Sequence, residues 1–485
     1  MAQLEKELII DDFDADGSGG RVSTLGETVE ILERAEKRVL SKFDWIVMPQ
    51  MSILVLFAYL DRTNIGNAKV FGFEKSLGMS GTDFHNISTF FYIPYIILET
   101  PWVMAVRKFG PGRVLAIAIV CWSGITIGTG FIQTYKQLIA CRLLLGSFEA
   151  GLFPALTFVI SSIYPATSQG KRIAVLYISI ALSGALGGLI AYGIQLMGKQ
   201  HGLEAWRWLF IIEGTISLVV GALCWVSLPT TPETAWFLGQ EERSTMSIVK
   251  VRNHPFEASD KFSWKQVVMA LTDPLVWLAS VSLFCSSIAM FGFSTFLPTL
   301  LNAMQYTSLQ ANYLSIPVYV LASIGTGITT FVSDRINRRA LCLIHSPLLV
   351  MTGYAIAVGT SNKSVGFFAM FLVGAGVYSY NTVLVTWVSN NIHPAYKRSV
   401  AIAVVISIGN AAGLAASQMY PNKDGPRYLL GNSLSLGFEA LALLSVGLIT
   451  LLLTYRMRQK KGLQDEGIET NGKEGDQSLE FKYVF

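Results

Sequence analysis

The stretch GKRIAVLYIS, residues 170–179, returns 226 residues later as YKRSVAIAVV, residues 396–405. The same offset aligns AVRKFGPGRVLA at 105–116 with FVSDRINRRALC at 331–342. One match between two basic loops is weak evidence, but two matches at one offset indicate an internal repeat. The chain is therefore predicted to consist of two equivalent halves.

The composition of the chain indicates a membrane protein. Of its 485 residues, 52% are hydrophobic and only 14% are charged, whereas soluble domains carry about 25% charged residues. Long apolar runs recur along the chain, and each can cross about 30 Å of hydrocarbon as a helix, which satisfies its own backbone hydrogen bonds. We predict twelve spans, at roughly 45–68, 87–106, 113–133, 137–160, 173–197, 208–228, 275–299, 312–333, 340–359, 365–389, 399–419 and 432–454.

The spans and the repeat predict an all-α membrane protein, with twelve transmembrane helices in two parallel six-helix halves around a central cavity. One long polar linker separates spans six and seven. The expected organisation is an N-terminal extension at 1–44, the two halves at 45–228 and 275–454, the linker at 229–274, and a tail at 455–485. Both extensions are polar, and we expect them to be largely disordered.

Basic residues mark one side of the predicted bundle. Twelve spans place both termini on the same side, and the loops on that side carry more Lys and Arg than the opposite loops. The positive-inside rule puts that side, with both termini, in the cytoplasm. We expect a multi-pass protein of the plasma membrane, whose net charge of +4 reflects these loops and not a nucleic-acid surface. The loop cations include Arg107, Lys108, Arg113, Lys171, Arg172, Arg335, Arg338, Arg339, Lys397 and Arg398.

Four charged residues stand out within the predicted spans of the first half. Asp61 and Arg62 are neighbours in YLDRTNIGNA (59–68), so on a helix they point about 100° apart and each needs its own partner. Arg142 and Glu149 are two helical turns apart and therefore share one face of span four. Charges at membrane depth cost a few kcal/mol, so each of the four is a functional candidate.

Together these residues can couple a proton to an anion. If the charged face of span four meets span one, protonation of either acid frees an arginine to bind a carboxylate. The alternative is a pair of buried salt bridges that lock the two spans together. The positions 226 residues after Arg142 and Glu149 hold Phe368 and Ala375. This asymmetry favours a functional role, because a lock required by the fold is expected in both halves.

Other polar residues also lie within the spans. For Glu213 we favour a structural role in contact with basic loops, whereas Glu99 is the next candidate for proton coupling. Phe291 and Phe293 are candidates to stack on a ring, although packing is the commoner role of such residues. The residues proposed to complete the substrate pocket are Asn64, Tyr378, Tyr380, Asn381 and Asn410.

A charged cluster in one loop suggests a gate. Asp334, Arg335 and Arg339 lie on the basic side of the bundle, and we interpret them as a latch that stabilises one access state without contacting substrate. The alternative is a solvated topology signal. The five cysteines lie inside apolar runs without metal-ligand spacing and are expected to be buried small hydrophobes. No nucleophile–base pair is evident, so we expect no enzymatic activity, cofactor or metal.

Several stretches resemble a known family. LDRTNIGNA (60–68), RLLLGSFEAGLFP (142–154), TWVSNNIHPAYKRSVAIA (386–403) and ISIGNAAG (406–413) are similar to the fungal allantoate permease family of anion:cation symporters, within the major facilitator superfamily. The resemblance runs from about residue 44 to 455. It implies import of small organic acids and vitamins, such as allantoate, nicotinate, pantothenate and biotin, usually with protons.

The resemblance also implies roles for the charged residues. More distant relatives, the organic anion carriers, have a similar Asp-Arg on span one and a similar Arg…Glu on span four. By resemblance, Asp61 and Glu149 act in proton coupling, and Arg62 and Arg142 act in anion binding or cavity gating. One departure is RKFGPGR (107–113), which lacks the acidic residue of the superfamily's loop motif, so no second latch is implied for the first half.

The leading hypothesis is a secondary active transporter that takes up a small organic anion, a carboxylate or vitamin-like acid, with protons by alternating access. Its partners are then the anion, protons and the lipid bilayer, and we expect a monomer. One alternative is an exporter or antiporter of a fungal metabolite, which uses the same fold. The other is a nutrient sensor that binds without translocation, and the short extensions disfavour it.

Overall fold

The computed structural model describes residues 21–80, 82–229, 231–253, 264–336, 338–468, 470–472 and 475–485. Within these ranges, every long element is a helix, and twelve helical segments are long and apolar enough to cross a membrane. The predicted fold class and the twelve predicted spans are therefore confirmed.

The membrane spans follow the two predicted halves. The first half contains α2 (Arg21–Val70), α4 (Asp83–Phe109), α5 (Pro111–Thr129), a fourth span made of α6 (Tyr135–Glu149) and α7 (Leu152–Ile163), then α8 (Ala166–Met197) and α9 (Ala205–Ser227). The second half contains α12 (Pro274–Ala303), α13 (Ser308–Ile336), α14 (Arg339–Gly359), α15 (Lys363–Asn391), α16 (Ala395–Ala416) and α17 (Leu429–Asp465). Among the shorter helices are α3 (Phe73–Ser76), and α10 (Gln240–Asn253) and α11 (Trp264–Leu271) of the linker.

Local sequence explains where several spans begin. Thr134 and Gln137 form a capping box at the start of α6, and the Asn362 side chain accepts hydrogen bonds from the amides of Ser364 and Val365 at the start of α15. Such caps satisfy amide groups that the first helical turn leaves without partners. Both helices consequently begin close to the predicted positions.

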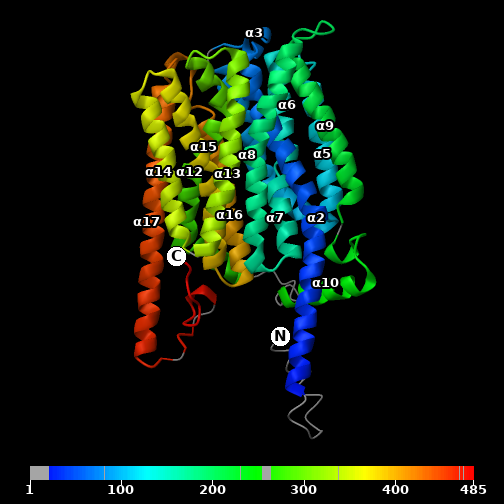
Figure 1. The fold of residues 1–485 in the computed structure, drawn as a ribbon, viewed down its shortest axis with the longest axis vertical. Helices are drawn as coiled ribbons and strands as arrows, with labels where there is room; N and C mark the ends of the chain where they lie inside the picture. The colour runs from blue at the N-terminus through cyan, green and yellow to red at the C-terminus, as the bar shows by residue number, and fades with distance from the viewer. Residues whose placement is uncertain are drawn as a thin grey trace.

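The helices form two bundles that meet along a central interface (Figure 1). Within the halves, α5 packs on α9 and α2 on α8, while α14 packs on α15 and α12 on α16. Across the interface, α2 packs on α12, α8 on α13 and α4 on α16. A two-fold exchange of the halves maps the three interface pairs onto one another and α2–α8 onto α12–α16, as expected if each half is one copy of the repeat.

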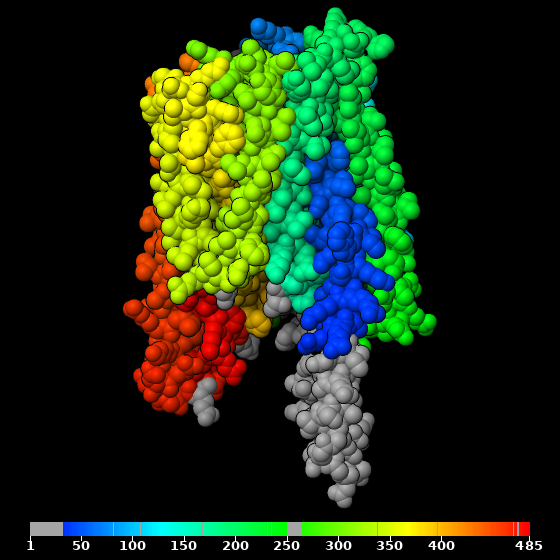
Figure 2. Space-filling view, in the orientation of Figure 1, coloured from blue at the N-terminus to red at the C-terminus, as the bar shows by residue number. Residues whose placement is uncertain are grey.

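The two ends of the bundle differ. The start of α2, helix α10 and the C-terminal segment lie at one end, here called the terminal end, and α3 lies at the opposite, distal end (Figure 1). At the distal end the halves are joined by hydrogen bonds from Lys69 to Asn422 and from His85 to the Ser417 carbonyl, both 2.8 Å long. At the terminal end, the surface is hollowed between the C-terminal segment and α2 (Figure 2). The two halves are therefore in direct contact at the distal end.

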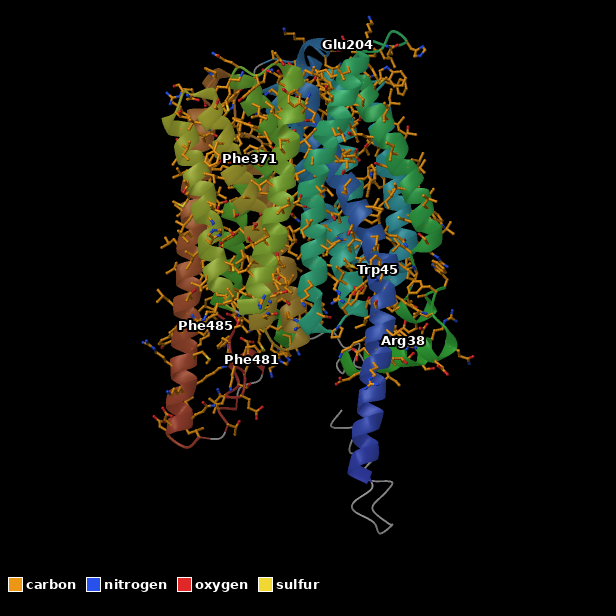
Figure 3. The ribbon with its side chains drawn as sticks, viewed as in Figure 1. Arg38, Trp45, Glu204, Phe371, Phe481 and Phe485 are labelled. Atoms are coloured by element: carbon orange, nitrogen blue, oxygen red, sulfur yellow. The ribbon has the colours of Figure 1, made fainter. Side chains whose placement is uncertain are left out.

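The expectation of disordered extensions is wrong for the described parts of both. Helix α2 begins at Arg21 and runs without interruption into the first span, and residues 1–20 lie outside the described residues. Helix α17 continues to Asp465, and residues 475–485 fold back beneath the second half, where Phe481 and Phe485 lie (Figure 3). Composition alone misses this order, because it depends on polar partners that only the folded bundle provides.

The repeated basic pairs tie helix ends together within each half. Arg172 makes a two-point contact with Asp44, at 3.0 and 2.6 Å, and so joins the start of α8 to α2. In the second half, Lys397 contacts Asp273 at 2.7 Å and joins α16 to the start of α12. Each half thus connects its first and fifth spans by an ion pair. Arg172 and Lys397 are therefore structural contacts within their halves.

Chemical labelling can test the predicted orientation of the bundle. Ser361 is exposed in the distal connection between α14 and α15, and Glu466 is exposed just after α17 at the terminal end. In a cysteine-free background, Ser361→Cys should react with a membrane-impermeant maleimide in intact cells. The matched Glu466→Cys variant should react only after permeabilisation, because the positive-inside rule predicts that the basic side faces the cytoplasm. The reverse pattern would overturn the orientation.

Candidate substrate and proton site

Glycines bring span four against span two. A Cβ atom at Gly146 would meet the backbone oxygen of Phe91, and one at Gly151 would meet the side chain of Trp102. Small residues allow this close approach of helices in a membrane. The approach holds Glu149, the last residue of α6, deep within the first half.

The central contact of the site is a buried ion pair. Arg62 Nε donates to Glu149 Oε2 at 2.8 Å, and the two side chains are 8% and 0% exposed. The guanidinium carbon lies 4.5 Å from the ring centres of Tyr59 and Tyr95 and 5.2 Å from that of Phe91. Aromatic faces attract a cation, so these rings stabilise Arg62 independently of its carboxylate partner.

Asp61 lies among different neighbours, as its predicted angle to Arg62 requires. It is buried, and neither carboxylate oxygen has a hydrogen-bond partner in the part of the chain that the structure describes. Thr126 of α5 and Glu213 of α9 lie near it, and both are buried with unsatisfied side-chain oxygens. Glu213 therefore does not contact basic loops as predicted. Buried acids without cationic hydrogen-bond partners are costly as anions, so this cluster is suited to hold protons.

Arg142 completes the charged group. It is buried on the same helix as Glu149, as the two-turn spacing predicts, and it interacts electrostatically with both Glu149 and Asp61. The Phe210 ring centre lies 5.8 Å from its guanidinium carbon. Its Nη2 atom is buried without a hydrogen-bond partner among the described residues. One donor of Arg142 is therefore available to a further acceptor.

A small cavity lies between the two halves, next to this group. Its volume is about 20 Å³, which is room for about one water molecule. Its first-half wall includes Tyr59, the residue that stacks on Arg62. Its second-half wall includes the predicted residues Asn381, Asn410 and Phe291. The walls must therefore move before an organic molecule can occupy this place.

A further acid joins the two halves beside the cavity. Asn410 Nδ2 donates to Glu99 Oε2 at 3.3 Å and links α16 to α4. Glu99 is buried. This contact crosses the interface between the halves, so the pairing of Glu99 depends on their relative position.

The structure places the remaining predicted residues away from the cavity. Asn64 and Tyr378 are buried, and neither is among the described residues that line the cavity. Tyr380 instead contacts Ser282 and the Ala442 carbonyl within the second half.

The predicted gate residues lie in a loop of the second half. Arg339 Nη2 contacts Asp334 Oδ1 at 3.0 Å, joining the ends of α14 and α13, while Arg335 is exposed. The cluster has a local ion pair inside one half, and its role as a latch remains a prediction.

Sequence reasoning missed Glu439 on α17. It is fully buried, and Ser286 Oγ donates to its Oε1 at 3.0 Å. The signal was available, because LGFEALAL (436–443) places one acid in an apolar span. Glu439 also stands 226 residues after Glu213, so the repeat relates the two acids. A buried glutamate on the last span of each half is thus part of the common scaffold.

Metal and disulfide chemistry find no support in the described ranges. No group of three or more His, Cys, Asp and Glu side chains there is arranged to hold a metal ion. Each of the five cysteines is a free thiol, and three of them are buried.

Twelve membrane-spanning helices in two related bundles, with buried charges beside the interface, define a membrane transporter and not an enzyme. The sequence matches the Major Facilitator Superfamily over residues 51–417, and the chain belongs to this family.

Similar proteins include two yeast transporters. The chain is 36% identical to an uncharacterized transporter of Schizosaccharomyces pombe over 100% of both chains. It is 31% identical to the high-affinity nicotinic acid transporter of Saccharomyces cerevisiae, over 93% of this chain and 85% of the relative. Among solved structures, a D-xylose–proton symporter has a TM-score of 0.64 at 15% identity and covers 84% of this chain and 97% of its own. A bacterial homolog of the lysosomal transporter Spinster has a TM-score of 0.62 at 16% identity, with coverages of 86% and 96%. These two structures share the fold.

A double-mutant cycle can test the coupling of Arg62 and Glu149. Glu149→Leu leaves a buried cation without its partner, so it should lower the free energy of unfolding by about 3 to 5 kcal/mol. Arg62→Met combined with Glu149→Leu should recover most of this loss, because both charges are then removed. Thermal unfolding of the purified protein in detergent measures both effects, with Glu466→Gln as a surface control. A double variant no more stable than Glu149→Leu would show that the two residues are not coupled.

Proposed function

We propose that the protein takes up a small organic anion together with protons by alternating access. The observation that carries this proposal is the Arg62–Glu149 ion pair beside the central cavity. Arg62 is a carboxylate-binding group that is engaged here by a carboxylate of the protein. Its Nη1 atom is buried without a hydrogen-bond partner in the described ranges, so its planar fork has a further donor for an incoming carboxylate.

If a substrate carboxylate replaced Glu149 as the partner of Arg62, Glu149 would take up a proton. When a substrate carboxylate takes Arg62, Glu149 loses its cation inside a buried site. A buried carboxylate without a partner is costly, so Glu149 accepts a proton at that point. When the substrate leaves, Arg62 returns to Glu149 and the proton is released. Anion binding and proton binding are thereby linked through one side chain.

Arg142 and Asp61 provide a second arginine and a second acid for the same link between anion binding and proton binding. Arg142 has a free donor and lies within electrostatic reach of both acids. Asp61 is buried without a hydrogen-bond partner among the described residues, which favours its protonated form. With two acids beside two arginines, more than one proton can accompany a monoanion. Uptake is then electrogenic, and the membrane potential adds about 2.3 kcal/mol per charge per 100 mV.

The walls of the cavity support one class of substrate. The first-half wall is aromatic, with Tyr59, Phe153 and Tyr177, and the second half contributes the amides of Asn381 and Asn410. Aromatic faces and a few polar groups suit a small planar acid. The relative from Saccharomyces cerevisiae is named for nicotinic acid, which has this chemistry. We infer a small carboxylate or vitamin-like acid as the substrate.

The proposal includes an orientation and two moving bodies. We place both termini in the cytoplasm and the protein in the plasma membrane, as a monomer. The halves at 45–228 and 275–454 rock against each other around the central site. The loop cluster of Asp334, Arg335 and Arg339 stabilises one of the access states.

Transport by purified protein tests the proposed function. In proteoliposomes with an inward proton gradient, a panel of labelled carboxylates that includes nicotinate should contain an accumulated substrate. Nicotinamide, which has the same ring without the carboxylate, should not accumulate. Failure of every carboxylate to accumulate, or accumulation that ignores the gradient, would overturn proton-coupled anion uptake.

Arg62→Lys tests the binding of the carboxylate. Lysine keeps the charge but loses the planar fork and its stacking on Tyr59 and Tyr95. The apparent affinity for the transported carboxylate should fall by roughly tenfold or more, because a charge-assisted hydrogen bond contributes at least that much. Arg113→Lys, at an exposed position of α5, is the matched control. Unchanged affinity in a folded Arg62→Lys protein would remove Arg62 from the substrate site.

Neutral variants of the two acids test the coupling. Asp61→Asn and Glu149→Gln mimic protonated acids, so they should still bind substrate and exchange it across the membrane. They should not accumulate it against a concentration gradient, because no proton is released on return. The measurement compares counterflow exchange with net uptake in proteoliposomes. If both variants concentrate substrate with the pH dependence of the unchanged protein, proton coupling lies elsewhere, and Glu99 is the next candidate.

A further inference from the structure

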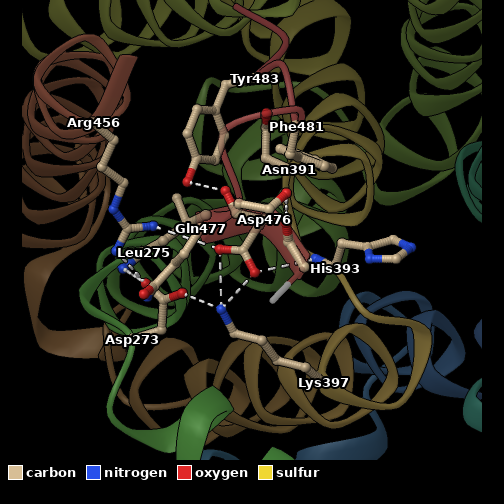
Figure 4. A network of polar contacts seen from close by, with 12 residues as sticks. Asp273, Leu275, Asn391, His393, Lys397, Arg456, Asp476, Gln477, Phe481 and Tyr483 are labelled. Carbon is tan, nitrogen blue, oxygen red and sulfur yellow. Dashed lines mark hydrogen bonds and ion pairs between the residues drawn. The ribbon is translucent and has the colours of Figure 1, made fainter. Parts of the chain in front are cut away.

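The segment 475–485 inserts a carboxylate into the terminal end of the second half (Figure 4). Asp476 is fully buried, and its two carboxylate oxygens accept hydrogen bonds from Lys397 Nζ at 2.8 and 3.0 Å. Lys397 also contacts Asp273 at 2.7 Å. Arg456 contacts Asp273 at 2.7 Å and Asp476 at 3.9 Å. Two anions and two cations therefore alternate in one network.

The balance of charge in this network requires the segment. Burial raises the pKa of Asp273, but the hydrogen bond and charge of Arg456 together with Lys397 bring it below its ordinary value, so Asp273 is ionised. Without Asp476, the cations Lys397 and Arg456 would face this single carboxylate. The corresponding pair in the first half, between α2 and α8, is complete with one acid and one base. The second half thus has a site with room for one more anion, which Asp476 fills.

The backbone of the segment is held as specifically as its carboxylate. Lys460 Nζ donates to the carbonyl oxygens of Asp476 and Phe481 at 2.6 and 2.9 Å. The Tyr483 hydroxyl donates to the Asp476 carbonyl at 2.6 Å. Burial raises the pKa of Tyr483 to about 12, so this hydroxyl keeps its proton at neutral pH.

The segment also forms hydrogen bonds with the end of α15. Asn391 exchanges two hydrogen bonds with the backbone of Val484, at 2.9 and 2.8 Å. Trp387 Nε1 donates to the same Val484 carbonyl at 2.8 Å. Trp387 follows Thr386, whose side chain lies against Gly170 of the first half. The segment therefore lies beside a contact between the two halves.

These contacts connect helices of the interface to a helix outside it. Helices α15 and α16 pack on α8 and α4 of the first half, whereas α17 packs on α12 and α14 within the second half. The segment binds α15 through Asn391, α16 through Lys397, and α17 through Arg456 and Lys460. Alternating access requires the terminal ends of the interface helices to move when the distal end opens. Because α17 moves with its own half, ties from these ends to α17 oppose the part of that movement in which the ends bend within the half.

We propose that the terminal end of the second half is a peptide-binding site for the chain's own segment 475–485, anchored by Asp476, and that its occupation restrains opening of the distal end. The ligand that this site fits is an acidic peptide whose carboxylate enters the network of Lys397 and Arg456. Displacement of the segment frees α15 and α16 and accelerates alternation between access states.

Two cysteine reporters can test the proposal without any substrate. In a cysteine-free background, Leu479→Cys reports release of the segment, because Leu479 is buried beneath the second half. Ser315→Cys reports opening of the distal end, because Ser315 is buried against Gly188 across the interface. Asp476→Asn should increase the rate of thiol labelling at both reporters by roughly tenfold, the size expected for loss of one charge-assisted hydrogen bond. Glu480→Gln, an exposed acid in the same segment, should change neither rate.

A milder substitution and the addition of a synthetic peptide provide two further tests of the proposal. Tyr483→Phe removes one hydrogen bond and should increase the labelling rate at both reporters by a smaller factor. Gel filtration and thermal unfolding show whether Asp476→Asn folds. If it does not fold, Tyr483→Phe is used for the test instead. A synthetic peptide of residues 475–485, added to the Asp476→Asn protein, should slow labelling at Ser315→Cys again, and the same peptide with the Asp476→Asn change should not. Faster labelling at Leu479→Cys with an unchanged or slower rate at Ser315→Cys would overturn the restraint. Unchanged rates at both reporters would overturn the site itself.

Discussion

A charge buried in a membrane protein needs a partner, and the contact between Arg62 and Glu149 meets this need for both residues. The pair exists because span four, made of α6 and α7, approaches α4 at Gly146 and Gly151, which brings Glu149 within reach of α2. The rings of Tyr59 and Tyr95 then surround the guanidinium. Under the proposed function, a substrate carboxylate replaces Glu149 as the partner of Arg62.

Comparison of the two halves distinguishes residues that support the fold from residues of the candidate site. The ion pairs Arg172–Asp44 and Lys397–Asp273 occupy equivalent places in the two halves, and a buried glutamate lies on the last span of each half. The four charges of the candidate site occur in the first half alone at the aligned positions. The C-terminal segment breaks the symmetry again, because its carboxylate joins the ion pair of the second half. Features that both halves share support the fold, and features of one half alone are the candidates for function.

The sequence predicted the scaffold well, and it predicted the burial of the four charged residues of the candidate site. Span number, the parallel halves and the burial of Asp61, Arg62, Arg142 and Glu149 follow from hydropathy and from the cost of buried charge. Asn381 and Asn410 were also placed at the cavity, since polar groups on apolar spans face the interior. Asn64 and Tyr378 were not found there, because helical rotation depends on packing with neighbouring helices. Glu439 was overlooked although its sequence signal was the same as that of Glu213.

By itself, the sequence determined the membrane class, the repeat and the separate directions of Asp61 and Arg62, because these depend on composition and on the helical period. The tertiary structure alone decided that Glu149 is the partner of Arg62 and that Asp61 lies beside Glu213. It also decided that Asp476 is buried in the network of Lys397 and Arg456. The reason is the same in each case. An ion pair joins residues far apart in the chain, and no local pattern specifies which of several possible partners the packing of helices will bring within 3 Å.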